Sequence, residues 1–144
     1  MFKAESLIIN LMNFSQVKTI DEELRVMLES GLVLREAGRL DEAEKIFLGV
    51  RELVPKSDVP IVSLSSLAVR RGDFDEALRL CEEALAIDPT SIFARVHHAE
   101  VLLYQRRREE AEIELHEIIK VAPESPHTRT AQALLDAAQL MEQN

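Results

Sequence analysis

The stretch DVPIVSLSSLAVRRGDFDEALRLCEEALAIDP, residues 58–89, decides the fold. Its pattern indicates one helix, a tight turn at Gly72 and a second, antiparallel helix that Pro89 closes. Ala77 and Ala84 are small residues on the second helix, at the places where two packed helices must approach each other closely. The stretch therefore predicts a helix–turn–helix unit.

The same pattern recurs along the chain with a period of 34 residues. Self-similarity at a fixed period of this length is typical of repeat proteins, in which each repeat packs on its neighbours. The positions in register are Pro55, Pro89 and Pro123; Ala43, Ala77 and Ala111; Gly38, Gly72 and Arg106; Gly31, Ser65 and Ala99; and Phe47, Cys81 and Leu115. The sequence therefore predicts an array of three stacked units.

A 34-residue helix–turn–helix unit with small residues at the crossings, a turn glycine and a closing proline resembles the tetratricopeptide repeat family. The three repeats are expected at residues 24–57, 58–91 and 92–125. The first has Val50 at the second crossing, and the third has Ile118 there and Arg106 at the turn. The resemblance implies an all-α fold, a right-handed superhelix of three helix–turn–helix repeats.

Two flanking segments complete the predicted single domain of residues 1–144. Residues 126–142 are expected to form a capping helix, because Ala131, Leu134 and Ala138 belong to one apolar stripe at helical spacing. Residues 1–18 are expected to form an N-terminal helix, and Phe2–Val17 is apolar on more than one face. That segment either packs on the first repeat or docks in a groove of its own chain or of a second copy.

Polar residues before the apolar runs predict where the helices begin, because their side chains can accept the unpaired amides of a first turn. Thr19 and Glu22 have the spacing of a capping box. The other expected caps are Asp41, Ser57 or Asp58, Asp73 with Glu76, Thr90 or Ser91, and Ser125.

The composition excludes several classes of function. The net charge of −9 argues against nonspecific binding to nucleic acid or to an anionic membrane. No apolar run approaches the roughly 20 residues of a membrane span, and the start of the chain lacks a clear secretory signal. The single cysteine, Cys81, allows no internal disulfide and suits a reducing compartment. We therefore expect a cytoplasmic protein without nucleic-acid binding or membrane insertion.

No catalytic, cofactor or metal site is expected from the sequence. His97 and His98 are adjacent and must point to different sides of a helix, so they cannot ligate one metal as an i, i+4 pair would. His98 occupies a slot that predicts packing between helices. Cys81 occupies the slot of Phe47 and Leu115, which predicts a buried, inert thiol.

The family resemblance implies that the first helix of each repeat lines a concave groove through repeat positions 2, 5, 9 and 12. The predicted partner-binding residues are Arg25, Leu28, Leu32, Arg35, Val59, Val62, Ser66, Val69, Phe93, Val96, Glu100 and Leu103. Most of them are apolar, which favours an amphipathic helix or an apolar extended segment as the ligand. The alternative is that some of them pack between neighbouring helices.

Some family members hold the C-terminal carboxylate of a chaperone in a clamp of Lys, Asn and Arg. This chain departs from that clamp: apolar residues and a histidine stand at the corresponding positions, which are Leu28, Leu32, Val59, Val62, Phe93 and His97. Carboxylate clamping of that kind is therefore not expected.

Two functions from different classes follow. The first is a protein-interaction module that shields an apolar segment of a partner, similar in general to the small tetratricopeptide chaperones of bacterial type III secretion. The second is a scaffold that self-associates as a homodimer or assembles a larger complex, with its groove filled by its own N-terminal segment. Arginines near each turn, at 35, 39, 70, 71 and 106–108, either complement helix dipoles or form a basic edge for an acidic partner.

Overall fold

The computed structural model describes residues 21–143, which form seven helices and no strand. The predicted all-α class is confirmed. The helices are α2 (Glu22–Glu36), α3 (Leu40–Leu53), α4 (Val59–Arg70), α5 (Phe74–Ile87), α6 (Ile92–Tyr104), α7 (Arg108–Val121) and α8 (Thr128–Glu142). The predicted N-terminal helix, residues 1–18, lies outside the described residues.

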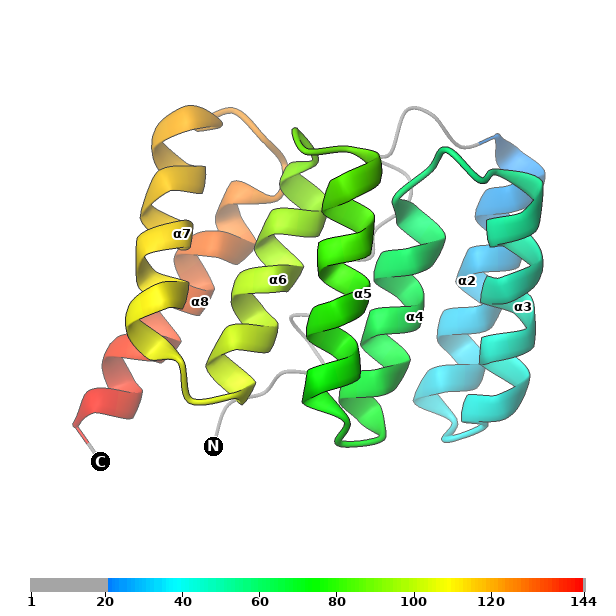
Figure 1. Cartoon of the computed structure of the whole chain (residues 1–144), viewed down its shortest axis with the longest axis horizontal. Helices are drawn as coiled ribbons and strands as arrows, with labels where there is room; N and C mark the ends of the chain where they lie inside the picture. The colour runs from blue at the N-terminus through cyan, green and yellow to red at the C-terminus, as the bar shows by residue number, and fades with distance from the viewer. Residues whose placement is uncertain (1–20, 144) are drawn as a thin grey trace.

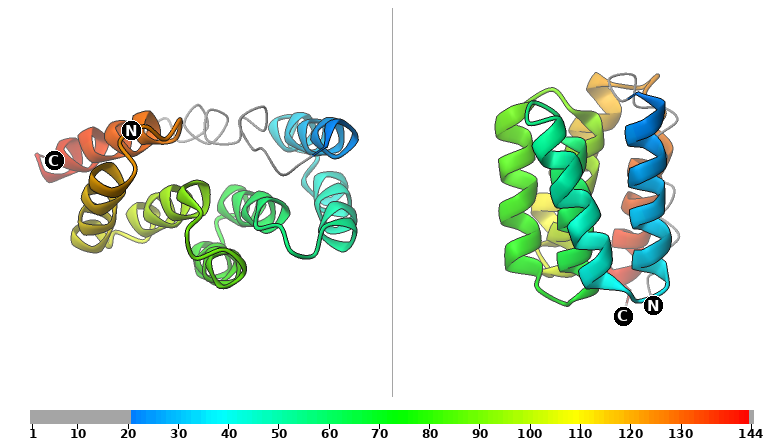
Figure 2. Two further views of the ribbon diagram at one scale, coloured as in Figure 1. Left: turned by 90° about the horizontal axis from the view of Figure 1, so that it is seen from above. Right: turned by 90° about the vertical axis from the view of Figure 1, so that its right-hand side faces the viewer.

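The described helices form three antiparallel pairs followed by α8 (Figure 1). Each helix packs on the next one along the chain, and α4 also touches α2 and α6. Seen from above, the array is an arc in which α2, α4, α6 and α8 lie on the inner side and α3, α5 and α7 on the outer side (Figure 2). This is the expected repeat superhelix, and it makes the inner side a concave face.

Residues at the predicted crossings are buried, as the repeat register requires. Ala43, Ala77 and Ala111 are fully inaccessible to solvent. The helices of the first repeat approach each other closely at Gly31, where a Cβ atom would lie 2.4 Å from Cε1 of the Phe47 ring. The first repeat therefore uses glycine on one helix to seat a large aromatic ring from the other.

The three turns within the repeats share one backbone geometry. Gly38 and Gly72 have φ angles of 78° and 76°, and Arg106 occupies the same left-handed conformation at 65°. In each turn the amide that follows bonds back to a carbonyl five residues earlier, as Asp73 N does to Ala68 O at 2.9 Å. The third turn therefore keeps the geometry of a glycine turn without its glycine.

Replacing Arg106 by glycine should stabilise the chain by about 0.5–1 kcal/mol, because a side chain is strained at positive φ. The larger conformational freedom of glycine in the unfolded chain offsets part of the gain. The midpoint of urea unfolding measures the effect. Gly72→Arg is the matched control and should shift the midpoint the other way; equal midpoints for all three proteins would contradict the argument.

Several predicted caps are confirmed. Asp73 Oδ1 accepts a hydrogen bond from Glu76 N at 3.2 Å at the start of α5. Ser91 Oγ accepts one from Ala94 N at 3.1 Å at the start of α6. Asp58 is the N-cap residue of α4, although its carboxylate accepts from Ser91 Oγ at 2.5 Å rather than from its own helix.

Three predicted helix starts are wrong. The N-cap of α2 is Asp21, whose Oδ1 accepts from Leu24 N at 3.0 Å, and Thr19 lies outside the described residues. Helix α3 begins directly after its left-handed turn, so Asp41 lies inside the first turn. Helix α8 begins at Thr128 because a turn precedes it, in which Thr128 N bonds to Ser125 O at 3.1 Å.

Helix α8 buries its apolar stripe against α7 and α6. The buried residues of the stripe are Ala131, Leu134, Leu135 and Ala138, whereas Met141 at its end is partly exposed. Of the described helices, none has the length and the apolar character that crossing a membrane would require.

Candidate functional site

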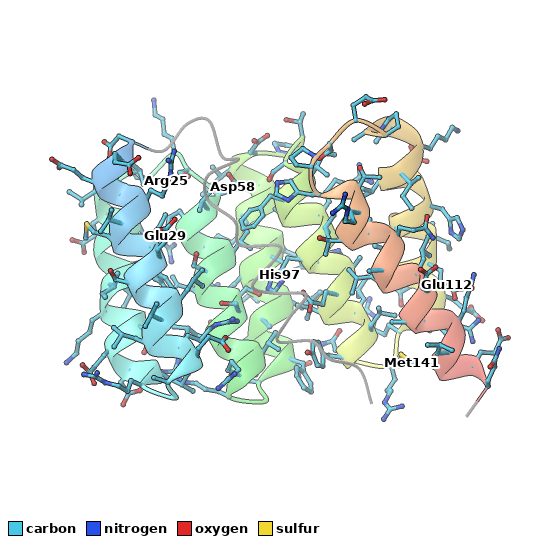
Figure 3. All side chains as sticks on the ribbon, turned by 180° about the vertical axis from the view of Figure 1, so that it is seen from behind. Arg25, Glu29, Asp58, His97, Glu112 and Met141 are labelled. Carbon is cyan, nitrogen blue, oxygen red and sulfur yellow. The ribbon has the colours of Figure 1, made fainter. Side chains whose placement is uncertain are left out.

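The twelve residues predicted to bind a partner belong to α2, α4 and α6, which lie on the inner side of the arc, and Figure 3 labels Arg25 among them. Ten of the twelve are buried, and Arg25 and Leu32 are partly exposed. The buried ones are Leu28, Arg35, Val59, Val62, Ser66, Val69, Phe93, Val96, Glu100 and Leu103. Most of the predicted partner-binding residues are therefore inaccessible to solvent in this structure, and partner binding at them stays a prediction.

Helix α4 is the most enclosed element, since every residue from Val59 to Val69 is buried. Its sequence is apolar or small on all sides until Arg70 at its end. At the other end of the face, part of the burial has a local cause. The Phe93 ring lies 5.4 Å from the His127 ring at the start of α8, so this groove position packs against a neighbouring helix, as the alternative interpretation expected.

A buried polar network lies behind the concave face and connects α4, α5 and α6. Ser65 Oγ is 3.1 Å from His97 Nε2, and His97 Nδ1 is 3.2 Å from Glu100 Oε2. Ser65 Oγ also donates to Ala77 O at 2.8 Å, and Cys81 Sγ lies 3.2 Å from it. These contacts tie the second repeat to the first helix of the third.

The order Ser65, His97, Glu100 has the spacing of a serine–histidine–acid triad, and the sequence analysis missed it. The three residues lie on two helices that only stacking brings together, and the one available signal was that Ser65 faces a crossing. All three side chains have no exposed surface, so an external molecule could reach them only after the groups that cover them had moved away. Their contacts serve instead to satisfy polar groups that stacking has buried.

The two adjacent histidines diverge, as predicted. His97 points into the network, whereas His98 Nδ1 lies 2.6 Å from Glu114 Oε2 of α7. Within residues 21–143, no three His, Cys, Asp or Glu side chains converge in a way that could hold a metal ion.

Cys81 is buried, as its repeat slot predicted. Burial raises the pKa of its thiol to about 12, against a smaller opposite effect of the hydrogen bond with Ser65. The thiol is therefore neutral at physiological pH and has little nucleophilic character.

Arg35 is the least expected residue of the concave face, since its side chain has no exposed surface. Its Nη2 donates to Glu36, while Nε and Nη1 have no hydrogen-bond partner within the described part of the chain. Burial lowers the pKa of the Arg35 guanidinium, whereas Glu36 and, more weakly, Glu100 raise it. Glu100 in turn has one carboxylate oxygen, Oε1, without a partner among these residues.

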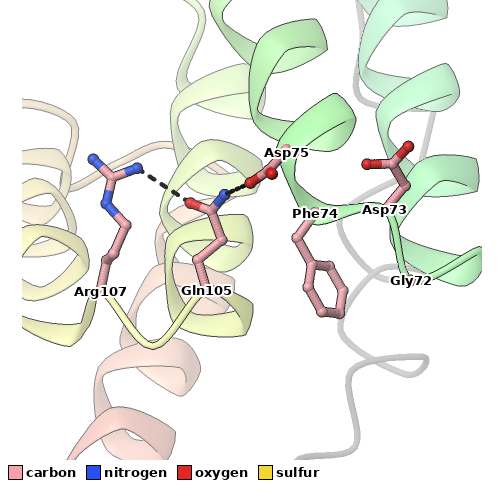
Figure 4. A pocket seen from close by; sticks show the side chains of 6 residues that line it. All are labelled: Gly72, Asp73, Phe74, Asp75, Gln105 and Arg107. Carbon is pink, nitrogen blue, oxygen red and sulfur yellow. Dashed lines mark hydrogen bonds between the residues drawn. The ribbon is translucent and has the colours of Figure 1, made fainter.

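The arginines at the turns do not form an uncompensated basic edge. Arg71 Nη2 lies 2.9 Å from Asp41 Oδ1, and Arg107 Nη2 lies 2.7 Å from Glu110 Oε2. Figure 4 shows the open depression beside the last of these turns, where Gln105 accepts from Arg107 and donates to Asp75. Acidic residues in the first turns of α3 and α7 therefore pair with Arg71 and Arg107.

A family model described as tetratricopeptide repeat matches residues 68–135, from the end of α4 to the middle of α8. These residues belong to the tetratricopeptide repeat family. The match covers the left-handed turns at Gly72 and Arg106 and the buried alanines of the second and third repeats. The family resemblance read from the prolines and small residues is thereby confirmed.

Anaphase-promoting complex subunit 3 of Schizosaccharomyces pombe is 30% identical over 94 residues, 65% of this chain. The match spans only 14% of the length of that protein. The similarity is therefore between this chain and one segment of that protein, and the activity and partners of the larger protein do not follow from it.

Three solved structures show the same fold. The type III secretion translocator chaperone SycD of Yersinia enterocolitica has a TM-score of 0.68 at 20% identity, over 88% of this chain and 99% of that one. PcrH of Pseudomonas aeruginosa has a TM-score of 0.66 at 22% identity, over 87% and 98%. The first tetratricopeptide domain of human RPAP3 has 0.68 at 20%, over 81% and 90%.

Proposed function

We propose that the chain is a protein-interaction module whose concave face holds an apolar or amphipathic segment of a partner protein, in the manner of a type III secretion chaperone. The observation that carries the proposal is the character of α4. A helix whose residues from Val59 to Val69 are all apolar or small must be covered on every side, and α4 lies on the inner side of an arc. An inner face of this kind needs an occupant.

Solved relatives of the same fold support this function. SycD has been solved with a peptide of the translocator YopD, and PcrH with the chaperone-binding region of PopD. We propose the same use for the twelve concave residues, with Val62 and Val96 as the apolar centre. Both have no exposed surface, so a partner segment would first have to displace the groups that cover them and would then be desolvated against them.

A second candidate is a scaffold whose groove is filled by its own N-terminal segment, Phe2–Val17. That segment lies outside the described residues, and its apolar sequence has the character that the face requires. The burial of ten concave residues favours this candidate, because an empty apolar face would remain exposed. In either function the free, buried Cys81 suits a reducing compartment such as the cytoplasm.

The test uses random 16-residue peptides displayed on phage and selected against the full chain. Wild-type protein should enrich apolar peptides, and Val62→Thr combined with Val96→Thr should lower their affinity by at least about tenfold, because hydroxyls replace methyl groups at the centre. Val26→Thr with Val33→Thr is the matched control, since both valines are more than half exposed on α2. Unchanged binding to the Val62/Val96 variant would place the site elsewhere.

Deleting residues 1–17 separates the two candidates in the same assay. If this segment fills the groove, its removal raises peptide affinity, because a competing occupant has been removed. It should also increase the binding of a hydrophobic dye. Unchanged affinity and no dye binding would exclude the segment as the occupant.

A further inference from the structure

The concave face contains two buried ionisable side chains whose hydrogen bonding is incomplete. Arg35 of α2 and Glu100 of α6 have no exposed surface. Within residues 21–143 no group bonds to Arg35 Nε, Arg35 Nη1 or Glu100 Oε1. The charge of Glu100 raises the pKa of the Arg35 guanidinium, although the two residues belong to different repeats.

Such an arrangement is costly for the free protein. A buried polar group without a partner destabilises a folded protein, and an unpaired charged group does so more strongly. Glu36, the hydrogen-bond partner of Arg35, also lies 3.9 Å from Arg70. His97 contacts the Oε2 atom of Glu100 and leaves Oε1 unpaired among the described residues. Buried polar atoms that remain unpaired in this way need an explanation, and a ligand that hydrogen-bonds to them supplies one.

We propose that Arg35 and Glu100 form a polar anchor for the partner segment, with Arg35 binding an acidic side chain of the segment and Glu100 accepting an N–H from it. The inference rests on the proposed function, because it concerns the same concave face. It adds a requirement that apolar burial alone does not impose: the segment is apolar but carries one Asp or Glu at a fixed place.

The chemistry of the two groups sets this requirement. A guanidinium offers a planar fork of N–H donors that fits a carboxylate, and such charge-assisted bonds are about twice as strong as neutral ones. An ionised carboxylate only accepts, so Glu100 Oε1 selects a donor. Because the two groups are opposite in charge and lie on α2 and α6, they would also fix the direction in which the segment runs along the face.

The anchor differs from the carboxylate clamp of other family members. Neither Arg35 nor Glu100 is one of the six residues, five apolar and one histidine, that stand at the clamp positions in this chain. A terminal carboxylate is therefore not required, and an internal acidic side chain suffices.

The experiment selects random 12-residue peptides on phage against the full wild-type chain, Arg35→Met, Glu100→Gln and Arg39→Met. Arg35→Met keeps the length of the side chain and removes the charge. Arg39→Met is the control, because Arg39 is exposed and paired with Glu42 outside the concave face. The best peptide is then synthesised with its acidic residue intact or changed to the amide, and calorimetry measures both. The peptide substitution tests the anchor even if a protein variant fails to fold.

We expect wild type and Arg39→Met to select apolar peptides with one acidic residue, and Arg35→Met to select apolar peptides without it. Glu100→Gln, which leaves an amide that can also donate, should relax the requirement for a donor. The amide peptide should bind wild type about 30-fold more weakly or worse, and both peptides should bind Arg35→Met equally. Apolar peptides without acidic preference would overturn this inference and leave the proposed function standing. No apolar enrichment with any protein would overturn both.

Discussion

Val62→Glu should destabilise the free chain by at least about 3 kcal/mol. Val62 has no exposed surface and lies in the middle of α4, where every residue from Val59 to Val69 is buried. A carboxylate placed there would be a charge in a buried apolar site, which is among the costliest single changes in a protein. The midpoint of urea unfolding, followed by circular dichroism, measures the loss.

Val33→Glu is the matched control for this substitution. Val33 is 68% exposed on α2, so the same change there should alter the free energy of unfolding by no more than about 0.5 kcal/mol. If Val62→Glu were as mild as Val33→Glu, the concave face would be open to water in solution. The substitution would then serve as a direct probe of partner binding rather than of folding.

This contrast marks the limit of what the sequence could predict for the site. The repeat register identified Val62 and its counterparts as apolar residues of the inner helices, and α4 lies there. Register specifies which way a side chain points, but not what covers it. Solvent accessibility depends on the curvature of the array and on whatever lies against the concave face. A 34-residue repeat pattern predicts neither of these.

The buried polar network of the site could not be predicted from the sequence, for a related reason. His97 and Glu100 are three residues apart on α6, a spacing that is common on helices, and Ser65 lies one repeat earlier. Their contacts at 3.1 and 3.2 Å arise only when α4 and α6 stack. Arg35 was assigned to the groove by its repeat position, but its full burial could not be predicted, because arginine is among the residues that are most rarely enclosed.

The fold itself was predictable because its signals are local and repeated. Gly38 and Gly72 mark the first two turns. The third turn has the same backbone geometry without a glycine, since Arg106 adopts the same positive φ. Helix starts were less predictable than helix pairs. Asp41, for example, is a residue type that is favoured at helix N-caps. Helix α3 nevertheless begins at Leu40, directly after the turn at Gly38, so Asp41 lies inside the helix.

Phe47→Ala should cost about 3–5 kcal/mol, the range for emptying a buried aromatic position. The Phe47 ring is fully enclosed between α3 and α2, and it contacts the site where Gly31 lacks a Cβ. Leu48→Ala, next to it on the same helix and 44% exposed, is the control and should cost clearly less, about 1 kcal/mol or below. Equal losses from the two substitutions would mean that the repeat register is misplaced by one residue.

Gly31→Ala then tests whether the two helices meet as the structure shows. In the wild type the new Cβ would lie 2.4 Å from Phe47 Cε1, so the substitution should destabilise by about 1–3 kcal/mol despite the better helix propensity of alanine. In the Phe47→Ala background the ring is gone, and the same substitution should stabilise by up to about 1 kcal/mol. Gly49→Ala on α3, where a Cβ would meet nothing within 4 Å, should stabilise both backgrounds alike. A sign reversal at Gly31 alone, measured from unfolding midpoints, requires direct contact between these two positions, whereas the same sign in both backgrounds would show that they do not touch.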